Sequence, residues 1–145
     1  MSGFLVDTNV LSEFNRRGDP NPLVKQWLET AVPTSLYLSV LNLAEIRFGV
    51  ERLPACRRRR QLEEWLEHDL PEWFADRVLP VDRSIADRWG VLRAEAESKG
   101  RPLPVVDGLL AATALEHGLA IVSRNVAHFA CVGLAVINPW EPASP

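Results

Sequence analysis

The stretch FLVDTNVLSEF, residues 4–14, predicts the first strand of an α/β sheet with an acid at its edge. Residues 4–6 are a short apolar run typical of a buried strand, and the apolar residues after them are spaced as on a helix. Thr8 or Asn9 is the expected cap of that helix. Asp7 then lies at the carboxyl end of the strand, where open α/β sheets bind ligands. It is therefore either a turn residue or part of a site.

The composition indicates one globular domain over residues 1–145. A chain of 145 residues with 47% hydrophobic side chains can bury one sizeable core. Proline and glycine fall between periodic segments and do not gather in a linker. Lys and Arg number 16 against 19 Asp and Glu, a net charge of −3. This balance gives no general attraction to nucleic acid or to acidic membranes, so nucleic-acid binding requires a local basic patch.

The expected location is the cytoplasm. Cys56 and Cys131 are too few for a disulfide framework or a cysteine-rich zinc site. The N-terminus has no basic leader followed by a long apolar segment. The most apolar later stretch, residues 105–122, is interrupted by Asp107 and Glu116, so we expect neither a membrane span nor a membrane partner.

Helical patterns alternate with short apolar runs along the rest of the chain. Strands are predicted at residues 36–39, 77–82, 119–123 and 134–138. Helices are predicted from the Asn21–Pro22 start through Leu28, over about 41–53, within 56–70, from a Ser84 cap to Gly100, and up to Gly118. This order predicts an α/β fold with a mostly parallel sheet and helices on both faces.

Glu45 is the second acid of interest. In the predicted helix 41–53, Leu41, Ala44 and Phe48 form an apolar stripe, and Glu45 falls on that stripe. We therefore expect its side chain to point inward. The alternative is a glutamate at the edge of the stripe, whose stem packs while its carboxylate reaches water.

Asp107 is the third acid. It stands in the first turn of an Ala-rich helix, where the helix dipole stabilises a carboxylate by about 0.3–1 kcal/mol, and this alone explains an acid there. The small side chains of Ala111, Ala112 and Ala114 also allow the helix to approach the sheet closely. Such an approach brings Asp107 towards Asp7.

Three clustered carboxylates require protons or a cation. At a separation of about 5 Å and an effective dielectric near 20, each pair repels by roughly 3 kcal/mol. Hard oxygen ligands without a Cys or His cluster favour Mg²⁺ or Mn²⁺ over zinc. The chemistry that these ligands suit is metal-assisted hydrolysis of a phosphodiester.

The chain resembles PIN-domain proteins, and in particular the FitB branch of the VapC toxin family. The resemblance covers LVDTNVLSE, LYLSVLNLAEIRFGVERLP with the arginine run after it, RVLPVD, VVDGLLAATALEHGLAIVSRN and VINPW. It implies a Mg²⁺-dependent ribonuclease that is the toxin of a type II toxin–antitoxin pair. It also implies an RNA substrate, a homodimer, and a cognate antitoxin with a DNA-binding domain that joins the toxin in a higher assembly.

Carried over by residue, this resemblance assigns the metal ligands and their neighbours. Asp7, Glu45 and Asp107 match the acidic metal ligands of the family, and Thr8 and Ser39 match small polar positions near the pocket.

The sequence departs from the family in SRNVAHF, residues 123–129. Family members usually place a further acid where Asn125 or His128 stands. With a neutral Asn125 supporting the pocket, we expect weaker cation binding and one metal ion instead of two. His128 is expected to be a polar loop residue and not a ligand. Arg124, beside the pocket, is either an RNA phosphate contact or a plain loop arginine.

Two further alternatives remain open in the sequence. The run Arg57 to Arg60 is either an RNA-backbone contact or, as we favour, a solvated helix face paired with Glu63, Glu64 and Glu67. The protein as a whole is either an active ribonuclease or a weakly active or inactive PIN scaffold in an antitoxin-bound, DNA-binding regulatory complex. Loss of the usual loop acid favours the scaffold, whereas retention of the three acids favours the enzyme. A phosphoaspartyl enzyme fits poorly, because Asn9 stands where such a site needs a second aspartate.

Overall fold

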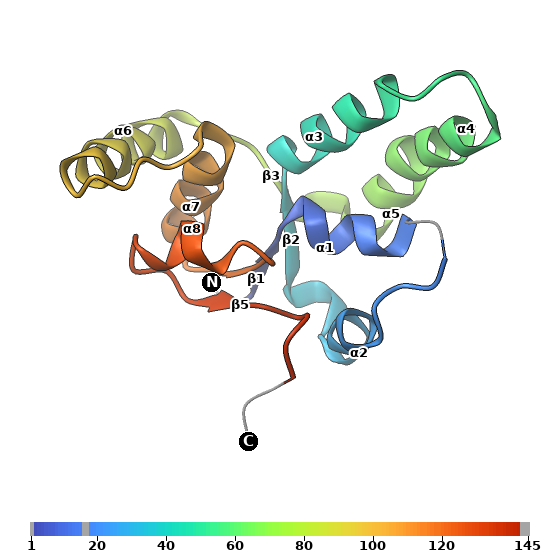
Figure 1. Cartoon of the computed structure of the whole chain (residues 1–145), viewed down its shortest axis with the longest axis horizontal. Coiled ribbons are helices and arrows are strands. Elements are labelled where there is room, and N and C mark those ends of the chain that lie inside the picture. Colours follow the sequence, from blue (N-terminus) through green and yellow to red (C-terminus); the bar gives the residue numbers. More distant parts are fainter. Residues whose placement is uncertain (1, 16–17, 143–145) are drawn as a thin grey trace.

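The middle layer of the molecule is a fully parallel sheet with the strand order β3-β2-β1-β4-β5 (Figure 1). The structure is a computed structural model that describes residues 2–15 and 18–142. Its strands are β1 (Phe4–Val6), β2 (Leu36–Ser39), β3 (Val78–Leu79), β4 (Ala120–Val122) and β5 (Val136–Ile137). Each lies within a stretch that the sequence predicts to be a strand.

Helices cover both faces of this sheet, as the alternating pattern predicts. In Figure 1, α6, α7 and α8 lie on one side of the sheet, and α1 to α5 lie on the other. The α-helices are α1 (Thr8–Ser12), α2 (Pro22–Thr30), α3 (Val40–Glu51), α4 (Arg57–Glu64), α5 (Leu70–Phe74), α6 (Arg83–Ser98), α7 (Val105–His117) and α8 (Val126–Ala130). A π-helical turn, Trp65–Asp69, joins α4 to α5, and short 3-10 turns occupy Glu13–Asn15, Pro33–Ser35 and Ala75–Arg77.

The core is divided by the sheet into two layers. Leu5 packs with residues of α6 and α7, whereas its neighbour Val6 packs with residues of α1 to α5. Successive side chains of a strand point to opposite faces, so β1 contributes to both layers. Burial on both faces is why this strand reads as a continuous apolar run and not as an alternating one.

Two helix caps differ from the sequence prediction. Asp7, and not Thr8 or Asn9, caps α1, since the Thr8 N–H donates to Asp7 Oδ1 at 2.7 Å. Likewise α6 is capped by Asp82, which accepts from the Ile85 N–H at 3.0 Å, and not by Ser84. In both places the helix begins earlier than expected, because an acid that closely follows a strand already takes the cap position.

The predicted inward stripe of α3 is wrong. The buried residues of α3 are Asn42, Ile46 and Val50, while Ala44 is exposed and Phe48 is 65% exposed. The helix carries apolar side chains on both its buried and its exposed face. Periodicity alone therefore identified the wrong face as the buried one.

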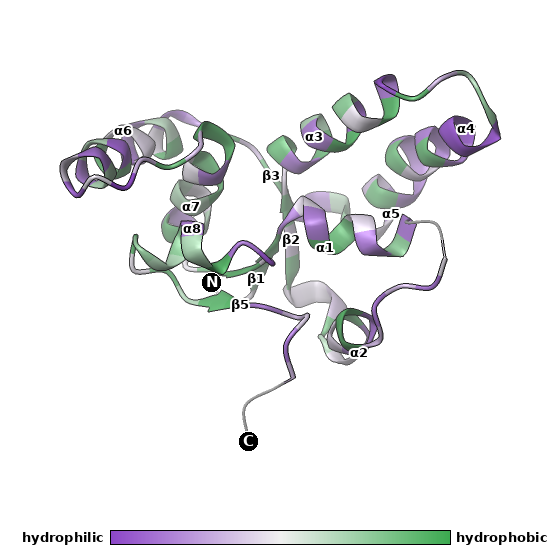
Figure 2. Cartoon of the chain, viewed as in Figure 1, coloured by the Kyte–Doolittle hydropathy of each residue, from purple (hydrophilic) through white to green (hydrophobic). Residues whose placement is uncertain are grey.

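The arginine run at the start of α4 is a hydrophilic surface (Figure 2). Only Arg59 of the run forms an ion pair among the described residues, with Glu63 at 2.9 Å and with Glu51 at 2.8 Å. The expected partners Glu64 and Glu67 pair elsewhere, with His68 and Arg47. Arg57 and Arg60 are exposed and Arg58 and Arg59 are half-buried, and most of the expected pairs do not form.

No helix in the described part of the chain is both long enough and apolar enough to cross a bilayer.

Candidate active site

Asp7 lies where the connections of the sheet change direction. From β1 the chain first adds β2 and β3 on one side, and later adds β4 and β5 on the other. Val6 pairs in register with Val122, and the Asp7 N–H donates to the Val122 carbonyl at 2.9 Å. Ligands of open α/β sheets bind at the carboxyl ends of the strands at such a switch point. Asp7 is therefore placed where a ligand site is expected.

The carboxylate of Asp7 is buried and held on both oxygens. It is 6% exposed, accepts from the Thr8 N–H through Oδ1, and accepts from the Ser123 hydroxyl through Oδ2 at 2.7 Å. Burial raises the pKa of Asp7 above its usual 3.8, and the nearby charge of Asp107 raises it further. The bonds from Ser123 and Thr8 oppose this effect without cancelling it.

Glu45 is joined to Asp7 through the neighbouring threonine. The Thr8 hydroxyl donates to Glu45 Oε1 at 2.8 Å and accepts from Asn42 Nδ2 at 3.0 Å. Glu45 is exposed as a residue, yet desolvation of its carboxyl group raises its pKa, and the charges of Asp7 and Asp107 add to the rise. Three acids on three separate elements are thus close enough to influence one another.

Asp107 is paired with a histidine. Its Oδ2 lies 2.5 Å from His128 Nδ1, and its side chain is 15% exposed. His128 belongs to α8, so the prediction that it is a loop residue is wrong. Residues 107 and 128 are far apart in sequence, and only the packing of α8 beside α7 brings them together.

The remaining predicted site residues lie around the acids without bonding to them. Ser39 is fully buried and caps α3, accepting from the Leu41 N–H at 3.1 Å. The Asn125 N–H donates to Ser123 Oγ at 3.0 Å, and Asn125 itself is exposed. The Arg124 guanidinium stacks over the ring of Trp140, 5.2 Å from its centroid.

Sequence reasoning missed two side chains that hold the acids in place. Ser123 and Asn42 are both fully buried, and they bond to Asp7 and Thr8, respectively. Ser123 is the last residue of the predicted strand 119–123, at the same sheet edge as Asp7. Asn42 stands three residues after Ser39, whose N–H donates to Asn42 Oδ1 at 2.8 Å in a capping box. Both positions carried a usable sequence signal.

The donor types suit a hard cation. All three acids offer carboxylate oxygens. Burial raises the pKa values of Asp7 and Glu45, and the charge of Asp107 raises both further, a repulsion that a cation would relieve. In the described residues, however, no three Asp, Glu, His or Cys side chains converge closely enough to hold an ion. Asp107 is instead paired with His128, and Glu45 with Thr8.

The raised pKa values predict an unusual pH dependence of stability in EDTA. A carboxyl group that binds its proton more tightly in the folded state stabilises the fold at low pH. That contribution is lost as pH rises from the unfolded values, 3.8 for Asp7 and 4.5 for Glu45, through the raised folded values. Asp7→Asn carries no such group at position 7. We therefore expect its Tm to exceed the wild-type Tm by a growing margin as pH rises through this window. Thermal unfolding at a series of pH values measures it, and a difference that stays constant would contradict the pKa assignment.

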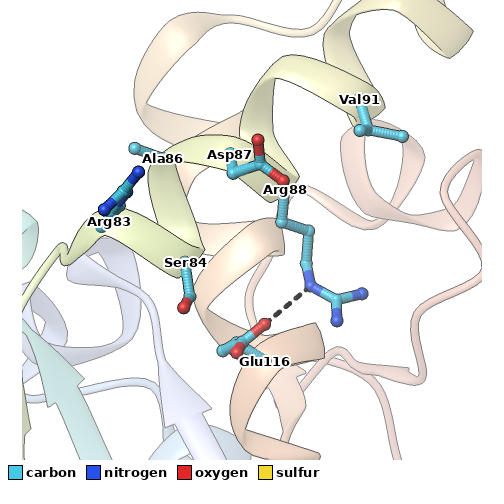
Figure 3. A pocket seen from close by; sticks show the side chains of 7 residues that line it. All are labelled: Arg83, Ser84, Ala86, Asp87, Arg88, Val91 and Glu116. Carbon is cyan, nitrogen blue, oxygen red and sulfur yellow. Dashed lines mark hydrogen bonds and ion pairs between the residues drawn. The ribbon is translucent and has the colours of Figure 1, made fainter.

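A separate depression of about 840 Å³ lies on α6 and the end of α7 (Figure 3). Arg83 and Arg88 line it, and Arg88 donates to Glu116 at 3.0 Å. None of the three acids lines this depression, so it is not part of the acidic site.

Comparison with known proteins identifies the fold. The family model of the PIN domain matches residues 4–131. The chain therefore belongs to the PIN-domain family, and the acidic edge lies within the matched range.

Within this family, the chain groups with the VapC and FitB toxins. It is 38% identical over 139 residues to VapC ribonuclease Y4jK of Sinorhizobium fredii, covering 96% of this chain and 99% of the relative. It is 38% identical over 137 residues to Toxin FitB of Neisseria gonorrhoeae, covering 94% and 98%. The solved structure of FitAB bound to an IR36 DNA fragment matches with a TM-score of 0.92 and 35% identity, over 97% of this chain and 98% of that one.

Proposed function

We propose that this protein is an endoribonuclease that acts as the toxin of a toxin–antitoxin pair in the cytoplasm. It hydrolyses RNA phosphodiester bonds at the acidic edge of the sheet with Mg²⁺, for which Mn²⁺ can substitute. The observation that supports this proposal is that Asp7, at the switch point of a PIN fold, has Glu45 of α3 and Asp107 of α7 near enough for their carboxyl charges to interact. Two relatives of similar length bear the names VapC ribonuclease Y4jK and tRNA(fMet)-specific endonuclease VapC.

Asp7, Glu45 and Asp107 would hold the metal ion. When bound, the ion supplies a Lewis acid for the phosphate and lowers the pKa of a water that can attack it. Ser123 holds the carboxylate of Asp7, and Thr8 holds that of Glu45, so two of the three acids are oriented before substrate arrives. Arg124 is our candidate for a phosphate contact beside them.

A single metal ion fits this set of charges. Asn125 and His128 carry no carboxylate where relatives of the family usually have one, which leaves three negative side chains in place of four. His128 is the one of these two that touches an acid. A second ion would therefore lack a carboxylate to balance its charge.

We further propose that the toxin is a homodimer inhibited by a cognate antitoxin with a DNA-binding domain. Support comes from the similarity to FitAB bound to DNA and to FitAcB from Neisseria gonorrhoeae, the latter with a TM-score of 0.91 and 37% identity. An acidic pocket suits a basic antitoxin side chain, which would form charge-assisted bonds with the carboxylates. The toxin and antitoxin would then bind operator DNA as one higher assembly.

The second candidate function is a weakly active or inactive scaffold within that DNA-binding complex. The pairing of Asp107 with His128 favours it, because a histidine on this carboxylate competes with a cation for the same oxygen.

Cleavage of RNA by the purified protein separates these two functions. We expect cleavage of total RNA that requires Mg²⁺ or Mn²⁺, stops in EDTA, resumes when the metal is restored, and is suppressed by the cognate antitoxin. The metal dependence follows from a site made only of carboxylates. A folded protein that leaves RNA intact at every metal concentration, while its antitoxin complex still binds operator DNA, would support the scaffold instead.

A further inference from the structure

A groove leaves the acidic site between α1, α3 and α4. It has a volume of about 520 Å³, and Thr8 and Glu45 line it together with Val50 and Arg58. Because Thr8 and Glu45 also belong to the acidic site, the groove is continuous with that site. Its walls are mainly apolar, and its cation, Arg58, comes from the start of α4.

Gly49 keeps this groove open. It lines the groove one helical turn after Glu45, on the same face of α3. A Cβ placed on Gly49 would meet no other atom within 4 Å, so any side chain there would extend into the groove. From Glu45 to Val50 the helix rises about 7.5 Å, at roughly 1.5 Å per residue. This length matches about two stacked nucleotides at roughly 3.4 Å each.

Arg58 and Arg59 are adjacent in sequence but differ in their contacts. The guanidinium of Arg59 is held by Glu51, by Glu63 and by the Leu53 carbonyl. Arg58 is half-buried and forms no hydrogen bond or ion pair with any described residue. An arginine that lines a groove and has no partner among the described residues is available to bind an anion.

We propose that this groove holds the RNA strand next to the cleaved bond, with Arg58 bound to a backbone phosphate. The inference rests on the proposed ribonuclease function and adds a substrate subsite to it. RNA is favoured as the occupant because the groove shares Glu45 with the cleavage site and offers one positive charge farther along. Its apolar walls suit the faces of ribose and bases, which bind without sequence readout. An RNA strand whose scissile phosphate lies at Asp7, Glu45 and Asp107 would enter this groove directly.

The first test measures RNA affinity without cleavage. Asp7→Asn protein is added to a fixed amount of fluorescein-labelled oligouridylate, and binding is followed by fluorescence anisotropy. The same titration is repeated with the double variant Asp7→Asn, Arg58→Gln. We expect Arg58→Gln to weaken binding roughly tenfold, as loss of a charge-assisted bond does. The slope of log Kd against log salt should fall by about 0.7, the value for one phosphate of a single strand. Arg60→Gln is the matched control, since Arg60 is exposed on the same helix outside the groove, and it should bind close to wild type.

The second test fills the groove without removing a charge. Gly49→Leu places a side chain in the open space and improves helix propensity, so the variant should fold. Gly90→Leu is its control, because Gly90 is also a helical glycine with no atom within 4 Å of its Cβ, but it lies on α6. We expect Gly49→Leu to weaken oligouridylate binding and raise the KM for RNA cleavage, and Gly90→Leu to change neither.

Wild-type affinity in both Arg58→Gln and Gly49→Leu would overturn the subsite. If these variants instead lost only inhibition by the antitoxin, the groove would bind that protein, and the proposal would also be wrong. Failure of the ribonuclease proposal gives a different result, because wild-type protein would then cleave no RNA whether or not the groove binds oligouridylate.

Discussion

Asp7→Asn is expected to lower the rate of RNA cleavage by more than about a hundredfold while the protein stays folded. The substitution removes one negative charge from the proposed metal site at the point where β1 ends. It keeps the size of the side chain, and an amide oxygen can still accept from the Thr8 N–H or from the Ser123 hydroxyl. Initial rates of cleavage of a fluorescent RNA in Mg²⁺, together with a thermal unfolding curve, measure the two effects separately.

The matched control for this prediction is Asp87→Asn. Asp87 is an exposed acid of α6 that lines the separate depression in Figure 3, so the same change of charge there should leave cleavage unaltered. Folded Asp7→Asn protein that cleaves RNA at the wild-type rate would exclude Asp7 as a metal ligand. Equal losses in Asp7→Asn and Asp87→Asn would point to net charge instead of a specific site.

Most of the fold was predictable because its strands are short, buried on both faces and bounded by clear helix signals. Asn21 before Pro22 marked the start of α2, and Gly118 marked the end of α7, where it takes a left-handed conformation. Caps were less predictable, since Asp7, Thr8 and Asn9 are all good capping residues in succession. The choice among them depends on where β1 stops pairing with β4, which the local sequence does not specify.

The candidate site was predictable as far as strand ends and helix starts define it. Asp7 and Asp107 follow from such positions, whereas the argument for Glu45 placed it on the wrong kind of face. Glu45 lies on the exposed side of α3 and reaches the site through Thr8. The contact between Asp107 and His128 depends on how α8 packs, and no periodicity or motif encodes that arrangement.

Gly108→Ala is expected to destabilise the fold by about 1–3 kcal/mol, or roughly 3–12 °C in Tm. Gly108 is buried in the first turn of α7, and a Cβ there would lie 2.5 Å from Cε3 and Cη2 of the Trp89 ring on α6. A rigid indole cannot shorten to relieve this overlap, so α6 and α7 must separate. Because Gly108 directly follows Asp107, the same movement should lower RNA cleavage. Thermal unfolding and cleavage rates measure both effects.

Whether Gly108→Ala lowers or raises the stability of the fold distinguishes a steric contact from helix propensity. In an open helix position, alanine in place of glycine stabilises by up to about 1 kcal/mol, and Gly90→Ala should behave in that way because no atom lies within 4 Å of its Cβ. Replacing Trp89 by leucine should abolish the penalty of Gly108→Ala, so the two substitutions should be strongly coupled in a double-mutant cycle. A Gly108→Ala protein as stable as Gly90→Ala would mean that α6 and α7 do not pack as closely as this contact requires. The placement of Asp107 beside Asp7 would then have to rest on contacts other than this one.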